Sequence, residues 1–150
     1  MQDTFSPEWC RSTFQLLIFL DEVYEAIENH DVLKTNTITW GEGETNEEGI
    51  PEVVIGFQVR KPHKKANHLW VGFWQLGQEM KMGCPIWLQA LKDEVWEPLI
   101  KQFPEAHQFE DDGAIGIEWP LPMDANLEAV REAGRNLGTR IIKVLSPPAQ

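Results

Sequence analysis

Apolar residues near the N-terminus recur at a spacing of three and four, which is the period of one face of an α-helix. Ser6, Pro7 and Glu8 make a favourable helix start, because serine caps free amides and proline tolerates the first helical position. The pattern predicts a long helix from Pro7 to about Asn29. The residues on its apolar face are Trp9, Leu16, Leu17, Leu20, Val23, Tyr24 and Ile27.

Three more apolar residues widen this helix face beyond a single stripe, namely Phe14, Ile18 and Phe19. An arc of this width requires either burial on two sides or an exposed patch for a partner. We assign the three residues to a partner or dimer face, and we expect the protein to form a homodimer.

From Thr37 onward apolar residues alternate with other residues, which is typical of β-strands. Such alternation occurs around Trp40 and in the segments 53–59 and 69–74, and the apolar segment 85–91 indicates a fourth strand. The turn-rich sequences GEGETNEEG and RKPHKK separate these segments and suit hairpin loops. We therefore expect an antiparallel, meandering sheet.

The second half of the chain predicts a short helix, a hairpin and a long helix. The short helix begins near Asp93, and Asp112-Gly113 marks the turn of the hairpin. Apolar residues at helical spacing between 127 and 145 predict the last helix, which Ser-Pro-Pro at 146–148 ends.

The predicted fold is therefore α+β, a two-layer sandwich with an antiparallel sheet of about six strands. Its order is helix, four strands, helix, two strands, helix, and the long N- and C-terminal helices cover one face of the sheet. We expect the 150 residues to form one domain, with a short proline-rich tail at 146–150.

Glycine occupies equivalent positions in three predicted strands, as Ile-Gly-Phe at 55–57, Val-Gly-Phe at 71–73 and Ile-Gly-Ile at 115–117. If the flanking apolar residues face the helices, the three glycines face the opposite side of the sheet. Glycine weakens a strand by about 0.5–1 kcal/mol relative to alanine, so three at matching places indicate a compensating use.

The glycines and their strand neighbours predict a shallow trough, with backbone atoms at its bottom and indole rings at its sides. We assign partner or ligand binding to the residues on this face, which are Val54, Gly56, Gln58, Trp70, Gly72, Trp74, Gly116 and Glu118. The alternative is that each glycine relieves crowding where the sheet bends, or admits a helix of the same chain.

The charge of the chain narrows the class of partner. Asp and Glu outnumber Lys and Arg by 24 to 13, which gives a formal net charge of −11. This charge opposes attraction to nucleic acid and to anionic lipid, and it favours partners with basic patches. The apolar run at 14–20 is too short to span a bilayer, so we expect a soluble, cytoplasmic protein without membrane contact.

Two patterns bear on metal binding and thiol chemistry. Glu44, Asn46 and Glu48 alternate before Gly49 as in the opening of a calcium loop, but Ile55 occupies the position of the required bidentate carboxylate. Two cysteines are too few for a thiolate metal site, and no local signature places a histidine beside Cys84 as a base. We therefore expect no metal, no cofactor and an acidic hairpin in solvent at 44–49.

The sequence Glu79-Met80-Lys81, with Glu52 upstream, resembles the carboxylate and Glu-x-Lys set of the restriction-nuclease superfamily. That resemblance implies carboxylates that hold magnesium and a lysine that positions water. In the family the motif lies on a buried strand and the upstream residue is usually Asp. Here the motif lies between Gly77 and Gly83 in a predicted turn.

In size, acidity and order of elements the chain also resembles the type III secretion chaperones, small acidic homodimers that hold a partner chain. This resemblance covers the arrangement of elements and no sequence motif. The leading functional prediction is an acidic, tryptophan-rich, non-catalytic protein-binding module of the chaperone, inhibitor or immunity and anti-defence type. It would dock its partner on the tryptophan-walled sheet face or on the helix face. The alternatives are a nuclease-like domain that uses Glu52, Glu79 and Lys81, and a small-ligand-binding domain.

Overall fold

Three helices and seven strands make up the part of the chain that the computed structural model describes. The described residues are 7–30, 33–35, 38–45, 51–76, 85–109, 112–118 and 125–146. In chain order the elements are α1 (Pro7–Glu28), β1 (Lys34–Thr35), β2 (Thr39–Thr45), β3 (Pro51–Arg60), β4 (Leu69–Leu76), β5 (Ile86–Ala90), α2 (Asp93–Gln102), β6 (His107–Phe109), β7 (Ala114–Ile117) and α3 (Leu127–Leu145).

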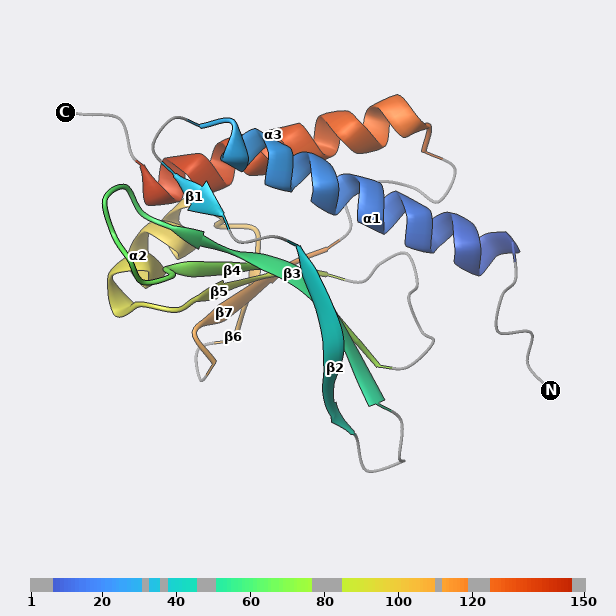
Figure 1. Ribbon diagram of the computed structural model, residues 1–150, viewed down its shortest axis with the longest axis horizontal. Coiled ribbons are helices and arrows are strands. Elements are labelled where there is room, and N and C mark those ends of the chain that lie inside the picture. The colour runs from blue at the N-terminus through green and yellow to red at the C-terminus, as the bar shows by residue number, and fades with distance from the viewer. Residues whose placement is uncertain are drawn as a thin grey trace.

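The strands form one antiparallel sheet in the order β1-β3-β4-β5-β7-β6, and β2 also pairs with β3. Helices α1 and α3 lie side by side across one face of this sheet, while α2 packs near the C-terminal end of α3 (Figure 1). The predicted α+β sandwich is therefore confirmed. One element was not predicted, the two-residue strand β1, which is too short to show a period.

The core lies between the helix layer and the sheet, and its side chains follow the predicted alternation. On β3 and β4 the fully buried residues Phe57, Val71 and Phe73 point toward the helices. The ring of Phe19 on α1 lies 6.4 Å from that of Phe73, and Tyr24 meets Phe57 edge-on at 5.2 Å. Burial of these side chains from both layers is what holds the helices on the sheet.

Helices α1 and α3 approach closely because two glycines of α3 face α1. A β-carbon added at Gly134 would lie 2.7 Å from Glu22 Cβ, and one added at Gly138 would lie 2.6 Å from Ala26 Cβ. Beside this contact the carboxylate of Glu22 lies 3.7 Å from Arg131 Nε and 3.7 Å from Arg135 Nη1. The small residues set the distance between the helices, and the ion pairs join their edges.

Arg140 of α3 joins the helix layer to the end of α2. Its Nη2 donates to Glu105 Oε1 at 2.6 Å and to the carbonyl oxygen of Gln102 at 2.7 Å. Its guanidinium carbon lies 4.1 Å from the centre of the Phe103 ring. The hydrogen bond from Arg140 holds the pKa of the Glu105 carboxyl below its usual value.

No helix within the described residues has the length and apolar character needed to cross a membrane.

Candidate functional site

The strand register brings the three strand glycines into a single row across the sheet. Gly56 pairs with Gly72, Gly72 with Trp87, and Trp87 with Gly116. Because neighbours in such a row share one face, all three glycines lie on the side away from α1 and α3.

The indole of Trp70 covers the pair formed by Gly56 and Gly72. A β-carbon added at Gly56 would lie 2.6 Å from Trp70 Cζ2, and one at Gly72 would lie 2.7 Å from the same atom. At Gly116 the nearest atoms to an added β-carbon are Phe109 Cε2 at 3.1 Å and Pro85 Cβ at 3.3 Å. The prediction that bare backbone forms the floor of a trough is therefore corrected, because aromatic rings of the sheet and Pro85, which precedes β5, cover the glycines. No described helix enters at these glycines.

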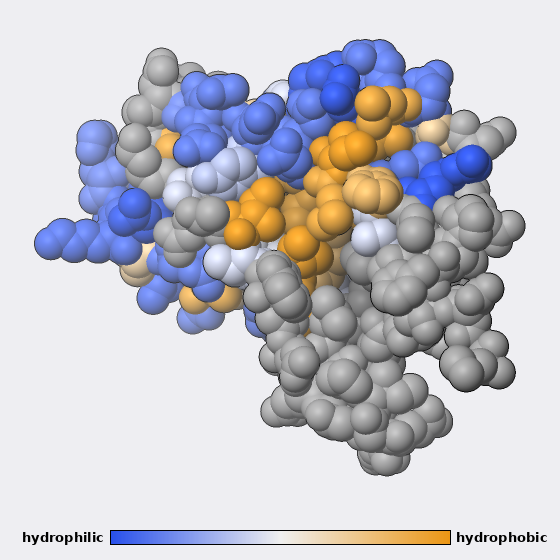
Figure 2. All heavy atoms as spheres, turned by 45° about the vertical axis from the view of Figure 1, so that its right-hand side comes forward, coloured by the Kyte–Doolittle hydropathy of each residue, from blue (hydrophilic) through white to orange (hydrophobic). Residues whose placement is uncertain are grey.

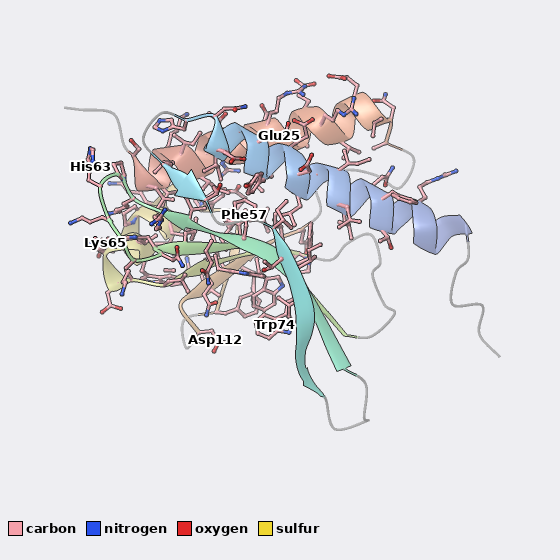
Figure 3. All side chains as sticks on the ribbon, in the orientation of Figure 1. Glu25, Phe57, His63, Lys65, Trp74 and Asp112 are labelled. Atoms are coloured by element: carbon pink, nitrogen blue, oxygen red, sulfur yellow. The ribbon has the colours of Figure 1, made fainter. Side chains whose placement is uncertain are left out.

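The rings that cover the glycines belong to a larger aromatic layer, which we define as Trp70, Trp74, Trp87, His107 and Phe109. Trp74 lies 6.4 Å from Trp70 and 6.4 Å from Trp87 between ring centres, and Trp87 stacks on Phe109 at 4.5 Å. His107 meets the edge of Phe109 at 4.7 Å. Figure 3 shows the rings around Trp74 gathered on the side of the sheet opposite the helices.

Solvent reaches this layer, and no described helix covers it. Trp74 is 42% exposed, while Trp70, Trp87 and Phe109 are half-buried. Trp87, Phe109 and His107 were not among the predicted site residues. A signal for Trp87 was present, because it occupies the strand position whose neighbours Ile86 and Leu88 face the core.

A small pocket opens within the aromatic layer. Its lining residues are Trp70, Trp74, Trp87, Gln89, Asp112 and Ala114, and its volume is about 130 Å³. Gln89 Nε2 donates a hydrogen bond to the carbonyl oxygen of Asp112 at 3.2 Å, which ties the turn before β7 to β5. Asp112 lies near Trp74 on the same side of the sheet (Figure 3).

The other predicted residues of this face lie around the layer. Val54 and Gln58 of β3 are half-buried, and Gln58 accepts a hydrogen bond from Asn67. Glu118 follows β7 and is exposed. The structure thus assembles the predicted residues on one side of the sheet, with glycines under the rings and polar groups at the margin.

The predicted partner face on α1 divides into exposed and buried residues. Phe14 is 64% exposed and Ile18 is half-buried, but Phe19 is only 1% exposed and packs on Phe73. The assignment of Phe19 to a partner face is therefore wrong, because α1 is buried on two sides. Figure 2 shows a band of apolar side chains over the helix layer, where Leu127 is also 46% exposed.

A polar cluster joins the β3–β4 hairpin to α2. His68 is 4% exposed, its Nδ1 lies 2.8 Å from the carbonyl oxygen of Ala66, and its Nε2 lies 3.0 Å from Glu94 Oε1. Lys61 Nζ lies 3.7 Å from the same carboxylate oxygen. Both ring nitrogens of His68 therefore face protein acceptors. These contacts join the hairpin to α2.

The candidate metal and thiol chemistry cannot be placed on the described part of the chain. Residues 79 and 81 of the nuclease-like motif, Cys84 and most of the acidic loop lie outside the described residues, and the side chain of Glu52 is not described. Among the residues that are described, no three His, Cys, Asp or Glu side chains are grouped as metal ligands.

Comparisons with protein-family models, with curated proteins and with solved structures give no match to this chain.

Proposed function

We propose that this chain is a non-catalytic protein-binding module that docks a basic partner on the aromatic layer. The observation that carries the proposal is the contiguous set of rings on the sheet face opposite the helices, with Trp74 42% exposed at its centre. Tryptophan is enriched at the energetically dominant positions of protein interfaces, because it supplies a large apolar area together with a polar N–H group. A chaperone, an inhibitor and an immunity or anti-defence protein would all use such a face.

Charge supports a basic partner. The chain carries a formal net charge of −11, and two exposed carboxylates, Asp112 and Glu118, lie at the margin of the aromatic layer. A rim of charge around an apolar centre is the usual arrangement of a docking surface. Complementary charge on the partner accelerates association and disfavours acidic competitors.

The size of the pocket favours a protein partner over a small ligand that acts alone. Pockets for drug-sized ligands measure about 300–1,000 Å³, whereas this pocket measures about 130 Å³. A partner would use the pocket for one side chain and the surrounding rings for the rest of its contact area. The nuclease-like alternative stays a prediction, because the side chains of Glu52, Glu79 and Lys81 lie outside the described part of the chain.

Site-specific photo-crosslinking tests the docking face. A photoreactive phenylalanine derivative replaces Trp74 in one protein and Glu132, exposed on α3, in a matched control. We expect basic proteins of the native host to cross-link at position 74 and not at position 132, because the two positions lie on opposite layers. Equal capture at both positions, or no capture at position 74, would contradict the proposal.

We also propose that the protein self-associates through the α1 face that contains Phe14. Its side chain is 64% exposed, and Leu127 on the same layer is 46% exposed. We expect light scattering at tens of micromolar to give the mass of a dimer. Phe14→Glu should give a monomer that keeps the circular dichroism spectrum of the folded protein, whereas Glu25→Lys, exposed on the same helix, should leave the dimer intact. If the wild-type protein is a monomer, the proposed self-association is contradicted, and the proposal for the aromatic layer is unaffected.

A further inference from the structure

The three indoles of the aromatic layer enclose the small pocket from different directions. Trp70 lies against the glycine pair and forms the floor, while the plane of Trp74 stands at 72° to it. Trp87 is inclined at 48° to Trp74 and is held in place by its stack on Phe109, whose plane differs by 13°. Ring faces at such angles can contact one small group on several sides at once.

The volume of the pocket fits a group of only a few heavy atoms. An apolar cavity of about 150 Å³ accommodates a benzene molecule, and this pocket measures about 130 Å³. The space therefore suits the end of a side chain, such as a branched apolar group or an alkylated ammonium.

Electrostatics favours the cation among these candidates. The face of an indole carries negative partial charge and attracts a cation more strongly than the face of any other aromatic side chain. Asp112 places an exposed carboxylate at the pocket and makes no ion pair with any of the described residues. A cation in the pocket would lie among three indole rings and beside one formal negative charge.

Hydrogen bonding then selects between kinds of cation. An unmodified lysine ammonium carries three strongly hydrated N–H donors, and among the described side chains that line the pocket only Gln89 and Asp112 offer acceptors. Gln89 donates its Nε2 to the turn at Asp112, so Oε1 is the one acceptor of this amide. A trimethylated ammonium has no donor to satisfy, so it enters without the loss of hydrogen bonds to water.

We propose that the pocket of Trp70, Trp74, Trp87 and Asp112 binds an alkylated ammonium group, supplied by a methylated lysine of the partner protein. The inference rests on the proposed docking function, because it names the group that the partner inserts. The pocket itself is a property of this chain and can be tested without the partner.

The test is a titration of the full chain, monitored by NMR through the chemical shifts of the tryptophan indole N–H groups. The probes are a short peptide with trimethyllysine, the same peptide with unmodified lysine, choline, and the neutral choline isostere 3,3-dimethylbutan-1-ol. We expect trimethyllysine and choline to shift the same indole signals. The neutral isostere should bind at least about tenfold more weakly, which is the effect of a desolvated cation–π contact. Unmodified lysine should also bind more weakly.

Two variants and a matched control locate the site. Trp74→Ala should abolish the shifts, and Asp112→Asn should weaken binding several-fold, because the carboxylate is lost while the backbone carbonyl that holds Gln89 remains. Glu132→Gln removes an exposed carboxylate of α3, on the opposite layer from the pocket, so it should leave the affinity unchanged.

The outcomes separate this inference from the docking function. Equal affinity for choline and its neutral isostere would overturn it, as would equal affinity for lysine and trimethyllysine. Retention of the full chain by phosphatidylcholine vesicles would overturn the assignment to a protein side chain. Capture of a partner at position 74, without any ammonium binding, would refute the pocket and leave the docking face standing. Ammonium binding without any captured partner would refute the docking face and leave the pocket standing.

Discussion

Gly72→Val should destabilise the protein by about 1–3 kcal/mol or more, because overpacking a tight interior carries a cost of this size. A β-carbon at this position would clash with the carbonyl oxygen of Ile55 and lie 2.7 Å from Gly56 Cα, both backbone atoms of β3. It would also lie 2.7 Å from Trp70 Cζ2. Backbone atoms cannot rotate away, so β3 and β4 would have to separate and the indole would leave its position.

Denaturant unfolding followed by circular dichroism measures this effect, with Gly116→Ala as the control. Gly116 lies in the same row of the sheet, but the nearest atoms to an added β-carbon belong to the Phe109 and Pro85 side chains, at 3.1 and 3.3 Å. Side chains can shift by a few tenths of an ångström, so the control should cost much less. A Gly72→Val protein as stable as the wild type would show that the space under Trp70 is open, as in the predicted trough.

Gly134→Ala should also destabilise the protein by about 1–3 kcal/mol, through the contact between α1 and α3. The added carbon would lie 2.7 Å from Glu22 Cβ and 2.7 Å from the carbonyl oxygen of Phe19. In an unconstrained helix interior, replacing glycine with alanine stabilises the protein by about 1 kcal/mol. A loss of stability in Gly134→Ala would therefore indicate the close contact between α1 and α3.

The matched control for this variant is Asn136→Ala, which changes an exposed position on the same helix. Surface substitutions of this kind usually alter the free energy of unfolding by less than about 0.5 kcal/mol. Thermal or denaturant unfolding of both variants gives the comparison. A Gly134→Ala protein more stable than the wild type would mean that the helices are not in close contact there.

Most of the fold was predicted from the spacing of apolar residues along the chain. The alternation on β3 and β4 placed Phe57, Val71 and Phe73 on the core face and the glycines on the other, because side chains of a strand alternate between its two faces. The helical period likewise placed Leu16, Leu20 and Val23 of α1 in the core.

Two features of the site depend on tertiary contacts that no period reveals. The position of Trp70 over the glycines depends on the register that pairs Gly56 with Gly72, and on a side-chain rotamer that only packing determines. Phe19 is buried because α1 contacts both the sheet and α3, which a single amphipathic stripe does not indicate.

The affinity of a purified partner for matched variants tests the central proposal most directly. Trp74→Ala removes a 42% exposed side chain from the aromatic layer, and Leu127→Ala removes a 46% exposed side chain from the helix layer. The aromatic-layer account predicts that Trp74→Ala weakens binding of a protein captured at position 74 by about 2 kcal/mol or more, as expected for a dominant interface tryptophan. It predicts no change for Leu127→Ala at equal folded fraction. Unchanged affinity in Trp74→Ala, with a loss in Leu127→Ala, would place the interface on the helices and contradict the account.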